Sequence, residues 1–230
     1  MSRAPLDLSL YLVTDTAMCG PLGVPATVAA AVAAGVTCVQ LRDPAADDDD
    51  FVAQGRLVRA ALADTGVALL INDRVHLVAA IGADGAHVGQ GDLDLAGCRA
   101  ILGDDAYLGL SVQDPAHVAA ALEHGVGAVD YLGVGPVWGT ASKPDHAPPG
   151  GVERLRAVRA LSPWPCVAIG GIGIDRVEQV RASGVAGIAV ISAICGQGDV
   201  GAATAGLRRA WDGNDEWRAA PTSTSTSTST

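Results

Sequence analysis

Short apolar segments rich in β-branched residues recur along the chain, and Ala-, Leu- and Val-rich helical patterns fill the intervals between them. This alternation predicts repeated strand–helix units, and the continuous apolar character of the strands predicts a parallel sheet buried on both faces. The predicted strands are residues 10–15, 38–42, 68–72, 85–89, 107–112, 128–135, 166–171 and 187–192. Eight such strands predict a single (β/α)8 TIM barrel, an α/β fold, over residues 1–215.

Several predicted helices end in glycine just before the next strand, as in the segments AAGVTCVQ and RASGVAGIAV. Glycine readily adopts the left-handed conformation that closes a helix. These endings therefore mark turns at the bottom of the barrel. A doubly wound open sheet is the alternative arrangement, but no G-x-G-x-x-G motif follows the first strand.

Two segments depart from the strand–helix pattern. Residues 139–151 are rich in Gly, Pro and Ser and lack apolar periodicity. They predict a long loop after the sixth strand, where barrel loops usually serve the active site. Residues 216–230 include a Ser/Thr repeat that buries too little apolar surface to fold, so we expect a disordered tail there.

The chain carries a formal net charge of −10 at pH 7, and four of its acidic residues form the run 47–50. This run is typical of a solvated helix start more than of a metal site. Because an acidic chain without clustered Lys and Arg should repel phosphate-rich partners, nucleic acids and anionic membranes are not expected to bind.

The sequence shows no secretory signal pattern and no apolar run of membrane-spanning length. We therefore expect a soluble cytoplasmic protein, either a monomer or a homo-oligomer. The odd number of cysteines and the absence of a C-x-x-C pair favour buried, reduced thiols for Cys19, Cys38, Cys98, Cys166 and Cys195.

Two carboxylates follow neighbouring predicted strands, Asp73 after the third and Asp92 after the fourth. The carboxyl ends of barrel strands share one rim, so the two side chains can converge. Carboxylate oxygens are ligands that Mg²⁺ accepts while keeping waters for substrate phosphates. The alternative is that Asp73 only caps the following helix.

Cations and glycines at the same rim indicate a phosphorylated ligand. Arg42 and Lys143 suit phosphate oxygens, and the pair Gly170-Gly171 together with Ile191-Ser192 can present backbone N–H groups to a phosphate. Two alternatives stay open: Arg42 could form a structural ion pair with Asp43 or Asp73, and the glycine pair could serve close packing.

Covalent catalysis is not indicated. The histidines show no metal-ligand spacing, and no nucleophile elbow or Ser-His-Asp order is present. His87 lies within a predicted strand and is expected to be a hydrogen-bonded interior side chain. The inventory points to electrostatic handling of phosphates.

At these positions the sequence resembles thiamine-phosphate synthases over about residues 8–212, in the segments YLVTD, QLRD, IND, HVGQ-x-D, GLSV, GP-x-x-GTASK, AIGGI and ISAI. The resemblance implies a Mg²⁺-dependent transferase. Its implied reaction joins 4-amino-2-methyl-5-(diphosphooxymethyl)pyrimidine to hydroxyethylthiazole phosphate and gives thiamine phosphate and diphosphate.

The resemblance also implies roles for individual residues. Contacts to the pyrimidine diphosphate are implied for Gln40, Leu41, Arg42, Asp43, Pro44, Asn72, Ser111 and Lys143. Contacts to the thiazole phosphate are implied for Thr140, Ala141, Ser142, Gly171, Ile191 and Ser192. The implied Mg²⁺ ligands are Asp73 and Asp92, and the implied catalytic residues are Arg42, Ser111 and Lys143.

Three positions depart from the family pattern: Pro44 replaces a lysine, Gly139 a proline and Ser142 a threonine. Because the family lysine is missing, an alternative is a thiazole tautomerase-like or non-catalytic paralogue on the same barrel. A sugar-phosphate isomerase or epimerase on the same barrel would need Asp43 or His87 as its base. A non-enzymatic ligand-binding barrel is the last alternative.

Overall fold

The computed structural model describes residues 4–92, 94–140, 142 and 147–213, and its strands close into one parallel barrel in sequence order. The strands are β1 Leu10–Val13, β2 Cys38–Leu41, β3 Ala68–Asn72, β4 Gly85–Val88, β5 Tyr107–Val112, β6 Tyr131–Val134, β7 Cys166–Ile169 and β8 Gly187–Val190. Pairing between β1 and β8 closes the ring. The predicted (β/α)8 barrel is confirmed, and the open-sheet alternative is wrong.

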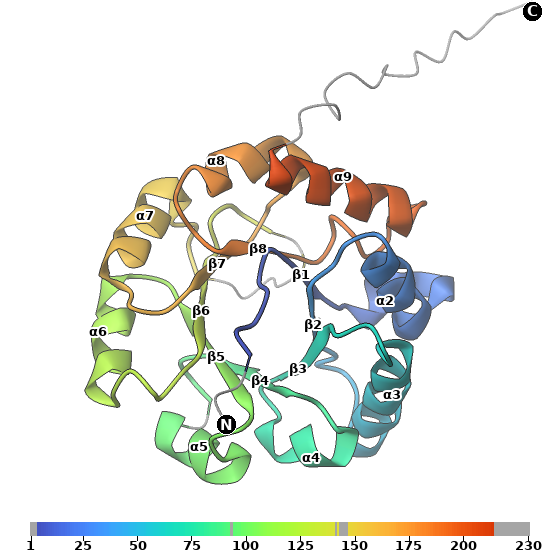
Figure 1. Ribbon diagram of the computed structural model, residues 1–230, viewed down its shortest axis with the longest axis horizontal. Coiled ribbons are helices and arrows are strands. Elements are labelled where there is room, and N and C mark those ends of the chain that lie inside the picture. Colours follow the sequence, from blue (N-terminus) through green and yellow to red (C-terminus); the bar gives the residue numbers. More distant parts are fainter. Residues whose placement is uncertain (1–3, 93, 141, 143–146, 214–230) are drawn as a thin grey trace, which may run out of the picture.

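Helices surround the barrel and cover its outer face (Figure 1). The α-helices are α1 Thr16–Cys19, α2 Val24–Ala33, α3 Asp48–Ala61, α4 Val78–Ile81, α5 Leu95–Leu102, α6 Pro115–Glu123, α7 Gly151–Leu161, α8 Val177–Arg181 and α9 Val200–Asp212. Short 3₁₀ helices are η1 Gly20–Leu22, η2 Val75–Leu77 and η3 Ile174–Arg176. The predicted tail, residues 216–230, lies outside the described part of the chain.

The acidic run begins α3, as predicted. The carboxylate of Asp47 accepts a hydrogen bond from the amide of Asp50 at 2.9 Å, and residues 48–50 fill the first helical turn. Negative charge there is favourable because the first amide groups of a helix are unpaired and carry partial positive charge. The glycines of the two quoted segments, Gly35 and Gly184, have the expected positive φ values of 113° and 78°, and Gly82 closes α4 with a φ of 74°.

Alternate residues of each strand point into the barrel or out toward the helices. The outward set forms the large core between strands and helices, with residues such as Leu12, Val39 and Ile71 fully buried. The inward set forms a smaller cluster made of Leu8, Tyr11, Val13, Cys38, Leu70, Tyr131, Val167 and Ala189. The barrel interior is therefore packed at the level of these residues.

The segment before β1 covers the lower end of the barrel. Leu8 belongs to the inner cluster, and the Tyr107 hydroxyl at the start of β5 donates to the carbonyl of Ala4 at 2.5 Å. In Figure 1 this segment runs across the barrel opening. The carboxyl ends of the strands, at the opposite end, are thus left for function.

All five cysteines are buried and unbridged, as predicted. The sulfurs of Cys19 and Cys195 lie 3.6 Å apart, and this contact lowers the pKa of the Cys19 thiol to about 6. Burial raises the pKa of the Cys166 thiol.

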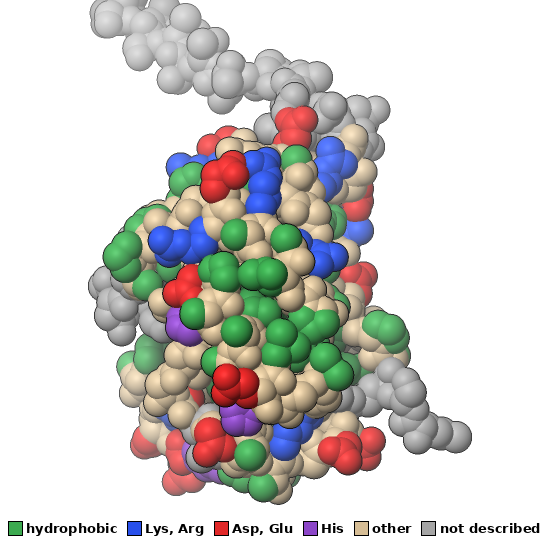
Figure 2. Space-filling view, turned by 90° about the vertical axis from the view of Figure 1, so that its left-hand side faces the viewer, with side chains coloured by type: hydrophobic (Ala, Val, Ile, Leu, Met, Phe, Trp, Pro, Cys, Tyr) green, Lys and Arg blue, Asp and Glu red, His purple; other side chains and the backbone are tan. Residues whose placement is uncertain are grey.

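The outer surface near α6 and α7 mixes charged and hydrophobic side chains, as Figure 2 shows. The exposed large hydrophobic residues in this part of the chain are Leu122, Val126 and Leu161.

Among the described residues, no single helix has the length and apolar character of a membrane span. The bent pair Thr16–Leu22 and Val24–Ala33 meets those criteria only when both members are taken together.

Candidate active site

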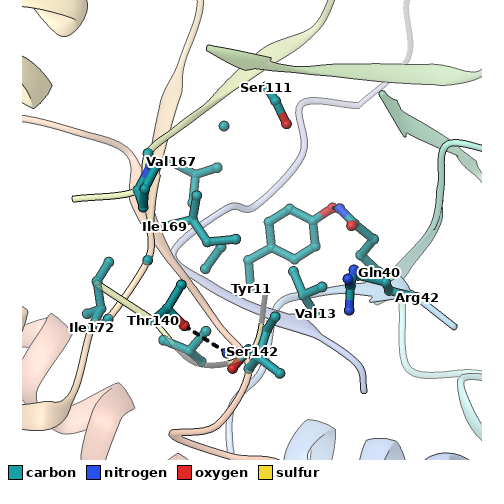
Figure 3. A pocket seen from close by; sticks show the side chains of 18 of the residues that line it. Tyr11, Val13, Gln40, Arg42, Ser111, Thr140, Ser142, Val167, Ile169 and Ile172 are labelled. Carbon is teal, nitrogen blue, oxygen red and sulfur yellow. Dashed lines mark hydrogen bonds between the residues drawn. The ribbon is translucent and has the colours of Figure 1, made fainter. Parts of the chain in front are cut away.

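A cavity of about 210 Å³ opens at the carboxyl ends of the strands. Its walls combine polar side chains from one half of the barrel with glycine- and hydroxyl-bearing loops from the other (Figure 3). The predicted site residues that line it are Gln40, Arg42, Asn72, Ser111, Thr140, Ser142, Gly171, Ile191 and Ser192. Residues from six strand ends or loops are thus brought to one place.

Strand alternation explains which predicted residues reach the cavity. Gln40 and Arg42 share the inward face at the end of β2, whereas Leu41 between them is fully buried in the outer core. Only the backbone of Leu41 is therefore suited to touch a ligand. Asn72 and Ser111 reach the cavity in the same way from β3 and β5.

Arg42 is held at the cavity by the end of β1. Its guanidinium lies 3.6 Å from the carboxylate of Asp15, and the exposed fraction of its side chain is 16%. The Arg42 amide donates to the Thr14 hydroxyl at 3.0 Å. The ion-pair partner is thus Asp15, in place of the Asp43 or Asp73 weighed from the sequence. A partly buried guanidinium with one carboxylate neighbour keeps other N–H groups for a ligand.

The loops after β6 and β7 approach each other closely at Gly171. This residue has a φ of 64°, and a Cβ there would lie 2.5 Å from the carbonyl oxygen of Gly139. A side chain at Gly171 is therefore excluded both by conformation and by space. Arg176 ties the same turn down, since it donates to the Gly171 carbonyl and stacks 4.8 Å from the centre of the Trp138 ring. Close packing and a backbone-lined ligand wall coexist here.

Part of the predicted long loop after β6 lines the cavity. The Ser142 amide donates to the Thr140 hydroxyl at 3.3 Å, drawn as the dashed line in Figure 3. The Ser142 hydroxyl contacts the sulfur of Met18 at 3.8 Å. Ala141 and Lys143, both predicted to contact substrate, lie outside the described residues.

Asp43 organises the loop that follows β2. Its carboxylate accepts from the Thr16 hydroxyl at 2.7 Å and from the amides of Ala45 and Ala46 at 3.1 and 3.2 Å. Pro44 is exposed on this loop. Neither residue belongs to the cavity lining found among the described residues.

Arg74 also braces this region. Its guanidinium pairs with Asp48 at 3.1 Å, donates to the Ala46 carbonyl at 2.5 Å and lies 4.6 Å from the centre of the Phe51 ring. These contacts direct its charge toward the start of α3. Arg74 is consequently poorly placed to supply the positive charge of the family lysine that Pro44 replaces.

Asp73 and Asp92 are exposed and follow the adjacent strands β3 and β4. The Asp73 amide donates to the His87 carbonyl at 2.9 Å, and Asp73 has a φ of 59°. The Asp92 carboxylate accepts from the Gly89 amide at 2.6 Å. The residue that precedes η2 is Arg74, whose side chain makes no capping hydrogen bond to this short helix. The N-cap position of η2 is thus occupied by Arg74, one residue after Asp73.

The thiamine monophosphate synthase family model matches residues 10–194. The chain belongs to this family. Among curated proteins, the thiamine-phosphate synthase of Psychrobacter sp. (strain PRwf-1) is 47% identical over 192 residues, which span 84% of this chain and 90% of that protein. The thiamine-phosphate synthase of Azorhizobium caulinodans is 45% identical, with coverages of 85% and 91%.

A solved structure is similar as well. Thiamine phosphate pyrophosphorylase from Pyrococcus furiosus superposes with a TM-score of 0.80 at 31% identity, covering 91% of this chain and 98% of that one. As a thiamine monophosphate synthase family member, the chain is an enzyme of the transferase class. The predicted function is confirmed, and the tautomerase-like, isomerase and ligand-binding alternatives gain no support.

The carboxylates fit the cation expected of the family. Among the described residues, no group of three or more His, Cys, Asp or Glu side chains could hold a metal ion alone. A pair of exposed carboxylates on adjacent strand ends instead suits Mg²⁺, which keeps waters and takes substrate phosphate oxygens as further ligands. Asp73 and Asp92 thus offer hard oxygen donors of the kind that Mg²⁺ takes, and the further ligands of such a site would be waters or substrate oxygens.

Several lining residues were not predicted from the sequence. The cavity floor and walls also include Tyr11, Val13, His87, Gln113, Val167 and Ile169. His87 is confirmed as a hydrogen-bonded interior residue, with Nδ1 2.8 Å from the Tyr131 hydroxyl and Nε2 2.9 Å from Ser111 Oγ. Tyr11 was missed because an aromatic residue inside an apolar strand is most simply explained as core.

Proposed function

We propose that this protein transfers the pyrimidinylmethyl group of 4-amino-2-methyl-5-(diphosphooxymethyl)pyrimidine to hydroxyethylthiazole phosphate with Mg²⁺. The two-sided cavity carries the proposal. Arg42, Asn72 and Ser111 come from the β2–β5 half, whereas Thr140 and Gly171 come from loops of the opposite half. One site thus offers separate polar regions for two phosphorylated substrates.

The proposed reaction forms one bond and breaks another. The thiazole ring nitrogen donates its lone pair to the pyrimidine methylene carbon, and the carbon–oxygen bond breaks so that diphosphate leaves with the bonding electrons. The aminopyrimidine ring can stabilise positive charge on the methylene during this exchange. The attacking nitrogen carries no proton, so the step needs no strong general base, in keeping with a site built from cations and hydrogen-bond donors.

The chain's own residues would act by position and charge. Asp73 and Asp92 would hold Mg²⁺, which would supply positive charge to stabilise the departing diphosphate. The Arg42 guanidinium, steadied by Asp15 at 3.6 Å, would bind diphosphate oxygens at the same end of the cavity. We propose that Lys143 adds a second cationic side chain. Such charges, fixed before the reaction, stabilise the transition state without reorganising.

The other half of the cavity would hold the thiazole phosphate. The hydroxyls of Thr140, Ser142 and Ser192 and the backbone at Gly171 and Ile191 suit a phosphate group. The side chains of Val13 and Ile169 lie between the two polar regions (Figure 3). These apolar walls would orient the two rings for in-line attack and exclude water, which would otherwise capture the methylene carbon.

Removal of divalent metal tests the proposal directly. Purified protein incubated with both substrates and Mg²⁺ is expected to form thiamine phosphate, and EDTA is expected to abolish product formation until excess Mg²⁺ is restored. Product would be measured by chromatography after oxidation to a fluorescent thiochrome. Protein that remains folded by circular dichroism yet forms no product with Mg²⁺ would contradict the proposed reaction.

Restoring a cation at Pro44 is expected to strengthen binding of the pyrimidine diphosphate. Pro44 is exposed on the loop after β2, and Arg74 nearby is committed to Asp48. A Pro44→Lys variant should lower the KM for this substrate by roughly threefold to tenfold, since a charged hydrogen bond contributes about 1 kcal/mol or more. The KM for the thiazole phosphate should stay unchanged.

The matched control places the same charge one residue later. Ala45 is also exposed, so Ala45→Lys changes net charge equally without occupying the Pro44 position. Steady-state kinetics of both variants would separate position from charge. Equal effects of Pro44→Lys and Ala45→Lys would mean that general electrostatic attraction, not a defined contact, is responsible.

We also propose a cytoplasmic location and small-molecule partners only. The net charge of −10 disfavours binding to nucleic acids and anionic membranes. Mixed acidic and basic side chains on the face seen in Figure 2 are in keeping with this. A homo-oligomer stays compatible with the proposal.

A further inference from the structure

A chain of hydrogen bonds crosses the floor of the cavity. Gln40 Nε2 donates to the Tyr11 hydroxyl at 2.8 Å, and the Tyr11 and Tyr131 oxygens lie 2.9 Å apart. Tyr131 continues to His87 Nδ1 at 2.8 Å, and His87 Nε2 continues to Ser111 Oγ at 2.9 Å. Both ends of the chain, Gln40 and Ser111, line the cavity, whereas Tyr131 is fully buried beneath it.

The neighbouring strands leave space for this chain of hydrogen bonds. In the barrel register, Gly109 stands between His87 on β4 and Tyr131 on β6. A Cβ at Gly109 would lie 2.2 Å from Tyr131 Cζ and 2.4 Å from His87 Nδ1. A Cβ at Gly133 would lie 2.8 Å from His87 Cε1. The two side chains meet only because these strand positions are glycine, so the contact is a built feature of the barrel.

The amide donor of Gln40 sets the donor-to-acceptor direction along this chain of hydrogen bonds. An amide NH₂ group has no acceptor lone pair, so the Tyr11 oxygen must accept from Gln40, and the Tyr11 hydrogen must go elsewhere. The Tyr131 oxygen at 2.9 Å is a better acceptor than the adjacent Cys38 thiol. The Tyr131 hydrogen is then directed to His87 Nδ1, because its oxygen already accepts from Tyr11.

The direction continues to the cavity. A neutral histidine that accepts at Nδ1 carries its proton at Nε2, so His87 donates to Ser111 Oγ. The Ser111 oxygen then serves as an acceptor within the protein, and its own hydrogen is available to a ligand. Burial raises the pKa of both Tyr11 and Tyr131 well above the usual value, so both hydroxyls keep their protons.

We propose that Tyr11, Tyr131 and His87 are positioning residues that make the Ser111 hydroxyl a hydrogen-bond donor toward a ring nitrogen of the pyrimidine substrate. This inference rests on the proposed function. Both ring nitrogens of a 4-aminopyrimidine are acceptors, whereas in the 4-oxo analogue N3, the nitrogen beside the oxo carbon, carries a hydrogen. In the proposed arrangement, N3 is the nitrogen that faces Ser111. A fixed donor at Ser111 therefore favours the amino compound, because a second donor opposite it would leave a buried polar group unpaired.

The tautomer of His87 is measurable without any assay of activity. In protein labelled with ¹⁵N-histidine, long-range ¹H–¹⁵N spectra distinguish Nε2–H from Nδ1–H, and comparison with a His87→Gln variant identifies the His87 signals. We expect His87 to be neutral and protonated at Nε2 near pH 7. Protonation at Nδ1 would reverse the direction of the chain and overturn the inference.

Tyr131→Phe tests the same chain by removing one hydroxyl while keeping the ring. The His87 tautomer should then shift toward Nδ1–H, since Nδ1 has lost its donor. We expect kcat/KM for the pyrimidine diphosphate to fall roughly tenfold, and the preference for the 4-amino over the 4-oxo analogue to fall by a similar factor. The KM for the thiazole phosphate should change less than about twofold.

Tyr107→Phe is the matched control. Its hydroxyl binds the Ala4 carbonyl at the opposite end of the barrel, so kinetics and the His87 tautomer should match the wild type. Active wild-type protein whose Tyr131→Phe and Tyr107→Phe variants show equal amino-over-oxo preference would overturn the positioning role. Failure of the wild type to form thiamine phosphate would instead count against the proposed function, and the tautomer of His87 would still decide the direction of the chain.

Discussion

Asp73→Asn and Asp92→Asn are each expected to lower kcat/KM in saturating Mg²⁺ by roughly a hundredfold or more, because each removes a negative charge from a site with only two proposed protein ligands. Loss of one carboxylate should also raise the Mg²⁺ concentration needed for half-maximal activity. The measurement is kcat/KM for the pyrimidine diphosphate across a Mg²⁺ titration.

Asparagine is the appropriate replacement at both positions. Asp73 has a φ of 59°, a conformation that asparagine tolerates and alanine does not, so an alanine variant would confound charge with strain. At Asp92, the amide oxygen of asparagine can still accept from the Gly89 amide. Folding stability, followed by thermal denaturation, should therefore change little in either variant.

A control for backbone conformation is present in the same chain. Asp64 has a φ of 61° and is exposed in the turn after α3, so Asp64→Asn tests the effect of the substitution away from the cavity. It should leave both activity and the Mg²⁺ response unchanged. A wild-type Mg²⁺ response in both Asp73→Asn and Asp92→Asn would remove the metal assignment.

The sequence was informative where a polar residue ends an apolar strand. In residues 38–42, the alternation of Gln40 and Arg42 with apolar neighbours indicates which face lines the cavity, and the structure places both side chains there. Asn72 and Ser111, which the family resemblance implied, also line the cavity. Apolar strand interiors gave no such indication, because inward and outward residues of a barrel strand are both buried.

Contacts set by the barrel register were harder to predict. Val13 pairs with Gln40 across β1 and β2, which places Asp15 beside Arg42, two residues farther along each strand. The sequence offered Asp43 and Asp73 as partners because they are closer in sequence or at the same predicted rim. Knowledge of the register would have identified Asp15.

The hydrogen-bonded floor left a weaker signal in the sequence. Tyr11 and Tyr131 are indistinguishable from core aromatics until their hydroxyl partners are known, and burial of a tyrosine hydroxyl normally requires such a partner. Glycines at the centre of β5 and β6 were the available sign, since glycine within a strand often marks the close approach of another group.

Gly109→Ala is expected to cause the largest loss of stability among these variants. The added methyl would lie 2.2 Å from Tyr131 Cζ and 2.4 Å from His87 Nδ1, and both neighbours are confined inside the barrel. Overpacking of this kind typically costs up to about 3 kcal/mol in the free energy of unfolding. For a chain of this size, the melting temperature should fall by roughly 6–12 °C.

The Gly109→Ala variant should also lose activity at temperatures where it is still folded. The added methyl would separate His87 from Tyr131, so His87 would no longer fix the Ser111 hydroxyl as a hydrogen-bond donor to the substrate. Gly127→Ala provides the comparison, since a Cβ at Gly127 meets nothing within 4 Å. Its melting temperature and kinetics should match the wild type. A melting temperature of Gly109→Ala equal to that of Gly127→Ala would contradict the tight contact at Gly109. An unchanged preference for the 4-amino over the 4-oxo analogue would contradict its link to substrate selection.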